Sequence, residues 1–136
     1  NKIEKFVLLG KICDFSTTHA GESIGLAAAI KTLDIYSTKS VISNINAKGR
    51  YIYKSFEETI SKYNLNDIFK VTGHPTYFKA VCISKKNTFD ITNSLYKVFF
   101  EKNILFKGIV SLSLSHQQKD LDQILDCFEK YCKQFN

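Results

Sequence analysis

The chain has 136 residues, 44% of them hydrophobic, and eleven Phe and seven Tyr supply enough apolar volume for one modest globular core. Its formal net charge of +6 raises the question of nucleic-acid binding, but Arg50 is the only arginine and the lysines are spread over every segment. Because phosphate and base recognition favour clustered arginine forks, we expect a solvated lysine-rich surface and no nucleic-acid partner.

Uncharged apolar runs are too short to cross a membrane, and the charged start of the sequence, NKIEK, is not typical of a secretory signal. We therefore expect a cytoplasmic protein without a membrane span. The sequence contains no methionine, so we expect it to be processed or to be a piece of something longer.

Potential metal ligands are scattered along the chain. No two cysteines form a CxxC pair, and each histidine stands alone in its segment, so the sequence predicts buried free thiols and no metal site. His74 is expected in a turn and His116 in the first turn of the last helix. The remaining residues of these two types are Cys13, Cys82, Cys127, Cys132 and His19.

After an expected connecting arm over residues 2–15, three hydroxyl residues, Ser16, Thr17 and Thr18, precede Gly21 and an alanine-rich segment. Apolar residues on almost every side predict a helix from Glu22 that is buried all round, which indicates missing partners. Two interpretations of the hydroxyls stay open. They cap the helix's own N–H groups, or they help these groups bind an anion.

The rest of the chain alternates between helical and strand-like patterns. The period of the apolar residues predicts a helix over residues 40–63, and β-type runs predict antiparallel strands over 68–72 and 77–84 with a turn at 73–76. Asp90 or Thr92 is expected to cap the next helix, which ends near 102. Strands are predicted over 104–106 and 109–114, and Ser115 with Gln118 has the capping-box spacing for a last helix.

These elements predict an α/β fold of the two-layer α+β type. An antiparallel sheet of four runs is expected to be covered on one face by the helices that start near Ser40, Asp90 and Ser115. The inner face of the last helix is expected to bury Leu121, Ile124, Leu125 and Phe128.

Several short motifs occur in an order that is typical of one enzyme family. STTHAGE at 16–22 with LAAA at 26–29, GHP at 73–75, ILFKG at 104–108 and SLSLSH at 111–116 resemble segments of class III, fold type I pyridoxal-phosphate (PLP) aminotransferases, especially glutamate-1-semialdehyde aminomutases. The first motif resembles the family's threonine-loop. The likeness covers nearly the whole chain, with departures at Thr17 (glycine is usual), Ser23 (proline) and Gln117 (threonine).

The resemblance implies that residues 38–136 are the family's small C-terminal α/β domain, and that residues 1–37 hold a connecting arm, the threonine-loop and the interdomain helix. The family's Schiff-base lysine, its aspartate partner of the pyridinium nitrogen and its ring-stacking aromatic residue all precede the threonine-loop. No catalytic residue therefore maps onto this chain, which is expected to be inactive alone.

The resemblance also implies pyridoxal phosphate as the cofactor of the complete protein, an upstream PLP-binding domain, a homodimer and a small amino or keto substrate. Thr18 matches the threonine that contacts the cofactor phosphate of the neighbouring subunit, and Thr17, Ser16 and Gly21 are further cofactor-binding candidates. An alternative stays open, in which the chain is a non-catalytic α/β binding or assembly module that has lost the PLP lysine. The residues upstream of Asn1 would distinguish the two.

Overall fold

The computed structural model describes residues 22–38 and 40–135. The chain divides into two units, Asn1–Lys39 and Ser40–Asn136, and each is described by itself.

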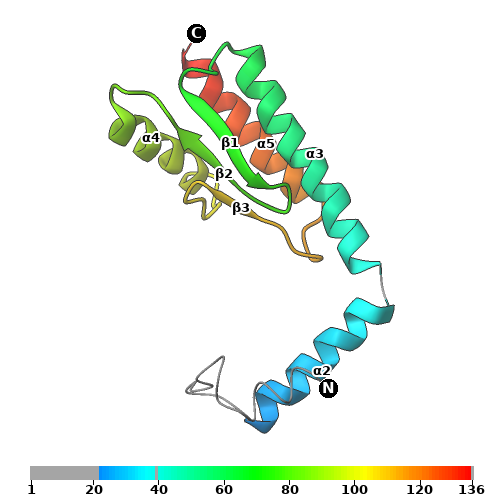
Figure 1. The fold of residues 1–136 in the computed structure, drawn as a ribbon. Helices are drawn as coiled ribbons and strands as arrows, with labels where there is room; N and C mark the ends of the chain where they lie inside the picture. Colours follow the sequence, from blue (N-terminus) through cyan, green and yellow to red (C-terminus); the bar gives the residue numbers. More distant parts are fainter. Residues whose placement is uncertain (1–21, 39, 136) are drawn as a thin grey trace, which may run out of the picture. The chain divides into compact units, whose positions relative to one another are not determined.

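In the first unit, the described residues form helix α2, Ser23–Thr38 (Figure 1). The predicted helix is confirmed, and the described residues leave it uncovered, which agrees with the expectation that its covering partners are missing. No residue of α2 is buried, because no second element is described in this unit to cover it. The large apolar side chains of α2 that are exposed are those of Ile24, Leu26, Ile30, Leu33 and Tyr36.

The second unit is a three-stranded antiparallel sheet with helices packed against it. The strand order is β1-β2-β3; α3 packs on β1, β2 and α5, and α4 packs on β2 and α5 (Figure 1). The predicted two-layer α+β architecture is confirmed. Its elements are α3 (Val41–Lys62), β1 (Phe69–His74), β2 (Tyr77–Cys82), α4 (Thr88–Phe100), β3 (Ile109–Ser111), α5 (Gln118–Cys132) and the 3-10 helix η1 (Lys133–Phe135).

The sheet has one buried and one open face, as its alternating sequence requires. Lys70, Thr72 and Lys79 on the open face are exposed. The buried positions alternate with them and are Phe69, Val71, Phe78, Ala80 and Val110.

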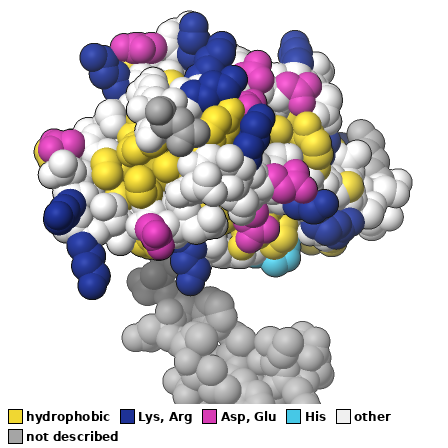
Figure 2. Space-filling model, turned by 90° about the horizontal axis from the view of Figure 1, so that it is seen from above, with side chains coloured by type: hydrophobic (Ala, Val, Ile, Leu, Met, Phe, Trp, Pro, Cys, Tyr) yellow, Lys and Arg dark blue, Asp and Glu magenta, His cyan; other side chains and the backbone are white. Residues whose placement is uncertain are grey.

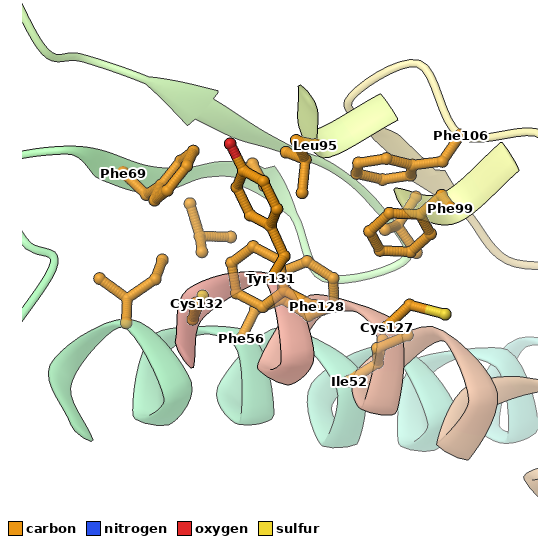
Figure 3. Close-up of a cluster of buried hydrophobic side chains, with 14 of the residues drawn as sticks. Ile52, Phe56, Phe69, Leu95, Phe99, Phe106, Cys127, Phe128, Tyr131 and Cys132 are labelled. Carbon is orange, nitrogen blue, oxygen red and sulfur yellow. The ribbon is translucent and has the colours of Figure 1, made fainter. Parts of the chain in front are cut away.

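Aromatic pairs form the centre of the core (Figure 3). The rings of Phe56 on α3 and Phe128 on α5 stack with centroids 4.1 Å apart and fix the two helices against each other. Leu121 and Phe128 are buried as predicted, whereas Ile124 and Leu125 are only half-buried at the edge of the core.

The prediction of a strand over residues 104–106 is wrong. Asn103 adopts a left-handed conformation (φ 59°), and the Ile104 N–H donates to the Phe99 carbonyl at 3.0 Å, which ends α4. The next turn directs Phe106 into the core, where its ring stacks on Phe99 with centroids 4.2 Å apart. Because Phe106 packs in the core, its segment lies outside the sheet, which has three strands in the described residues where four were predicted.

Two helix starts also differ from the prediction. Helix α4 follows Asn87 rather than Asp90 or Thr92, because Ser84 already orders the preceding turn by bonding to Lys86. Helix α5 starts after Gln117, which forms a capping box with Asp120, including a bond of 2.7 Å from the Gln117 N–H to the Asp120 carboxylate. Ser115 and His116 therefore precede the helix.

No helix in the described ranges is both long and apolar enough to cross a membrane. On the face in Figure 2, Lys and Arg side chains alternate with Asp and Glu around apolar patches, and no continuous basic stripe crosses it.

Candidate functional site

The four predicted cofactor-binding residues, Ser16, Thr17, Thr18 and Gly21, lie outside the described residues, so their role stays a prediction. The start of α2 is described, and its residues can be compared with the predicted phosphate site. The first turn of α2 contains no acidic residue, and the first N–H groups of any helix have no partner within it, so this turn fits a bound phosphate.

Glu22, directly before α2, complicates this fit. Its Oε1 lies 3.8 Å from the position that a Cβ on Gly25 would occupy, so the carboxylate lies beside the first helical turn. A negative charge at a helix N-terminus is favourable for the helix but repels a second anion. A phosphate bound here would therefore have to share the helix N-terminus with Glu22.

In the second unit, polar side chains gather where α3 meets two connections. We call this region the α3 junction; it consists of Lys48 and Gly49 on α3, His74 at the end of β1, the β1–β2 turn at 75–76 and the loop at 112–117. The Leu112 N–H donates to the Thr76 carbonyl at 3.0 Å, which joins turn and loop. The Lys48 Nζ donates to the carbonyls of Leu114 at 3.2 Å and His116 at 2.5 Å, which joins α3 to the loop.

Gly49 lets the β1–β2 turn lie directly on α3. A Cβ at this position would be 2.9 Å from both the carbonyl carbon and the carbonyl oxygen of Pro75. Only glycine allows the backbone of the turn to come this close without a shift. His74 was expected in the turn but is the last residue of β1, paired with Tyr77; its Nδ1 bonds to the Thr76 hydroxyl at 2.9 Å and so holds the turn that follows.

His116 organises the loop from within. Its Nδ1 accepts the Ser113 N–H at 2.9 Å. Lys48 Nζ and His116 Nδ1 thus both bond to backbone groups of the loop, and the α3 junction has a structural role.

Two of the three described thiols are buried in the core. Cys127 and Cys132 are free and buried, as predicted, and Cys82 is half-buried. Burial raises the pKa of Cys132 to about 12 and also raises the pKa of Cys127, so both stay protonated and unreactive at neutral pH. Within residues 22–38 and 40–135, no group of three His, Cys, Asp or Glu side chains is placed to hold a metal ion.

Sequence reasoning missed the α3 junction, although one signal was present. Gly49 interrupts an otherwise regular helical pattern, and an isolated glycine in a helix often marks a close approach of another backbone. The roles of Lys48 and of the Gln117–Asp120 capping box depend on long-range placement and on an uncommon cap residue, so local patterns did not reveal them.

The fold is that of one part of PLP transaminases. A transaminase with PLP bound superimposes on 90% of this chain with a TM-score of 0.76 and 17% identity, and the chain covers 30% of it. The FumI protein of Sphingopyxis sp. MTA144, in its PLP internal aldimine form, matches 96% of this chain with a TM-score of 0.77 and 16% identity; 31% of it is covered.

Among proteins of similar sequence, glutamate-1-semialdehyde 2,1-aminomutase of Methanocella arvoryzae is 23% identical over 125 residues, which are 83% of this chain. The chain spans 29% of the length of that relative. No protein-family model matches the chain. The expected resemblance to a C-terminal part of such an enzyme is therefore confirmed.

Proposed function

We propose that the chain is a C-terminal part of a PLP-dependent aminotransferase or aminomutase, and that it supplies a cofactor-phosphate contact and a dimer surface to the complete homodimeric enzyme. The observation that carries the proposal is the match of the fold over 90% or more of this chain to about 30% of PLP transaminases. A fold shared with only part of an enzyme favours a role beside a larger PLP-binding domain.

Helix α2 supports the same proposal. Its five large apolar side chains are exposed on a helix in which Lys31 and Asp34 are the only charged residues. Such a helix gains stability when other surfaces cover it, and an upstream domain or a neighbouring subunit would provide them. In the alternative binding module, that apolar surface would need an external partner.

For the cofactor, we propose that Thr18 donates a hydrogen bond to the phosphate across the dimer interface. In this proposal Gly21 lets the backbone come close to the phosphate, and Ser16 and Thr17 are further candidates for phosphate contacts. The acid-free first turn of α2 supports this placement, and Glu22 beside that turn opposes it. Bound pyridoxal phosphate supplies the electron sink of the reaction, and the lysine that attaches it is expected upstream.

The first test uses the complete coding sequence and the chain itself. We expect a lysine at the end of a strand-like segment upstream of Asn1. We also expect that the 136-residue chain, incubated with pyridoxal phosphate and reduced with borohydride, carries no stoichiometric adduct at one lysine. A stoichiometric adduct with activity, or a complete protein without an upstream lysine segment, would contradict the proposal.

The second test replaces Thr18 with valine in the complete protein. Loss of one hydrogen bond to a charged group, about 1.5–3 kcal/mol, should raise the dissociation constant for pyridoxal phosphate about 10- to 150-fold without loss of folding. Thr32→Val is the matched control, because the Thr32 hydroxyl donates to the Ala28 carbonyl within α2. Equal cofactor affinity of the Thr18 variant and the parent would return Thr18 to the role of a helix cap.

A further inference from the structure

A second candidate site lies at the edge of the sheet, where β2 is longer than its neighbour β3. The β2–β3 pairing ends at Lys79 and Ile109, and a last bond of 3.1 Å joins the Ala80 N–H to the Gly108 carbonyl. Beyond this point β2 has no strand beside it on that side, and α4 packs along it (Figure 1). The gap is a pocket of about 360 Å³, lined by Lys79, Ala80, Val81, Cys82, Thr88, Thr92, Tyr96, Lys107, Gly108 and Ile109, which we call the β2-edge pocket.

The backbone of β2 directs a hydrogen-bond donor into this pocket. In an antiparallel strand, alternate residues bond to opposite neighbours. The Ile83 N–H bonds to Ile68 on the β1 side, and the Ala80 N–H bonds to Gly108 on the β3 side, so the Cys82 N–H points to the β3 side. Within the described residues it meets no backbone acceptor there, because residues 104–106 leave the sheet.

Helix α4 adds a row of hydroxyl groups. Thr88, Thr92 and Tyr96 are spaced four residues apart, which places them along one face of the helix. The Thr88 hydroxyl donates to the Ser84 carbonyl. The side chains of Thr92 and Tyr96 are half-buried and make no hydrogen bond to any described residue, so both hydroxyls remain able to donate.

Gly108 keeps the pocket open beside Tyr96. It adopts a left-handed conformation with φ 77°, and a Cβ there would lie 3.0 Å from the Tyr96 hydroxyl. A side chain at this position would be strained and would fill the space that the hydroxyl faces. Gly108 thus leaves space in front of the Tyr96 hydroxyl, which lines the pocket.

The charged residues that line the β2-edge pocket are both lysines. Lys79 and Lys107 are exposed at its rim, neither forms an ion pair with a described residue, and no carboxylate lines it. Asp90, two residues from each threonine, is directed to a different face of α4. The β2-edge pocket is therefore lined by two lysines at its rim, by two hydroxyls without a hydrogen-bond partner among the described residues, and by the edge of β2 that carries the Cys82 N–H.

We propose that the β2-edge pocket binds a small oxyanion, a phosphate or a carboxylate group, with Lys79 and Lys107 supplying charge and Thr92, Tyr96 and the Cys82 N–H supplying directed hydrogen bonds. Charge-assisted bonds of this kind are the strongest that proteins make to such groups. A phosphate and a carboxylate would use the same donors. They differ in size and in the number of acceptor oxygens, so the occupant is found by comparing them.

The test titrates the 136-residue chain with inorganic phosphate and, separately, with malonate, and follows the backbone amide resonances by NMR at low salt. We expect saturable shifts that include the Cys82 amide, with one of the two ligands binding more tightly. Lys107→Gln and Lys79→Gln should each weaken that binding about tenfold, Thr92→Val should weaken it severalfold, and Lys107→Arg should retain it.

Lys119→Gln is the matched control, since Lys119 is exposed in the first turn of α5, forms no ion pair with a described residue and carries the same charge. It should change the affinity less than twofold. Circular dichroism spectra identical to that of the parent would show that each variant is folded. Equal weakening by Lys119→Gln and Lys107→Gln would mean general charge attraction, and shifts that never saturate or spare Cys82 would likewise overturn the proposal.

Discussion

Replacing Gly49 with alanine tests how closely the β1–β2 turn packs on α3. In the middle of an exposed helix, this change is normally stabilising by about 0.5–1 kcal/mol, because glycine has more backbone freedom to lose. Here the new Cβ would lie 2.9 Å from the Pro75 carbonyl carbon and oxygen and 3.0 Å from Cγ2 of Thr76. These distances are too short, so the helix or the turn must move.

The energetic cost of that movement decides whether Gly49→Ala raises or lowers the free energy of unfolding. The two closest atoms are backbone, and the turn is held from both sides by the β1–β2 pairing and by the bond from the Leu112 N–H to the Thr76 carbonyl. We therefore take a cost in the upper part of the range for overpacking, about 2–3 kcal/mol, which outweighs the gain in helix propensity. The net expectation is a loss of about 1–2 kcal/mol in the free energy of unfolding.

Urea denaturation followed by circular dichroism measures this loss. With a slope of about 2 kcal/mol/M, the midpoint should fall by about 0.5–1 M. Asn44→Ala, at an exposed position on the same helix, is the control and should raise stability by a few tenths of a kcal/mol, because alanine has the higher helix propensity. A Gly49→Ala protein as stable as the parent, or more stable, would refute the close packing of turn and helix.

Two further predictions concern the second unit. The pKa of Glu129 is lowered, first by the hydrogen bond from Lys62 (2.8 Å) and then by that from the Tyr63 hydroxyl. The ionised Glu129 therefore stabilises the folded state at pH values above the ordinary glutamate pKa of about 4.3. This stabilisation is lost as the pH falls through the lower pKa of the folded state. Glu129→Gln should abolish this pH-dependent part of the free energy of unfolding, which is expected to be below about 1 kcal/mol because Lys62 is largely exposed. Glu58→Gln, which removes an exposed ion pair with Lys54, should leave it unchanged. Urea titrations at several pH values measure both. Leu121→Ala should cost about 2–5 kcal/mol because the side chain is fully buried, and Leu125→Ala clearly less because Leu125 is half-buried; similar losses for both would contradict the observed orientation of α5.

The sequence was most informative where a periodic pattern was long. Helices α3 and α5 carry apolar residues at helical spacing over four turns or more, and the burial of Ile52, Phe56, Leu121 and Phe128 follows that spacing. The strands β1 and β2 were equally clear because Phe69, Val71, Phe78 and Ala80 alternate with polar residues.

Short segments were ambiguous, because local pattern does not fix tertiary use. The pattern of residues 104–106 predicts a strand, yet Phe106 stacks on Phe99 in the core and the segment lies outside the sheet. The start of α5 was misplaced because serine is the commoner cap, while Gln117 forms the capping box with Asp120. Local rules left the hydroxyls of residues 16–18 open between helix capping and anion binding, and the family resemblance singled out Thr18 as the candidate phosphate contact.

Helix α2 links the energetics of the chain to its proposed function. An isolated helix of 16 residues is only marginally stable in water, and most helices in proteins are stabilised by packing of their apolar faces. Burial of a large apolar side chain contributes about 1.5–3 kcal/mol, so full burial of the five exposed ones on α2 would contribute about 7.5–15 kcal/mol as an upper bound. The only charges on the helix, Lys31 and Asp34, lie three residues apart and leave most of its circumference apolar. One part of a larger enzyme would use this surface to assemble, and a binding or assembly module would use it to hold an external partner. Both interpretations therefore require a partner surface for α2, and the match of the fold to about 30% of PLP transaminases favours the enzyme part.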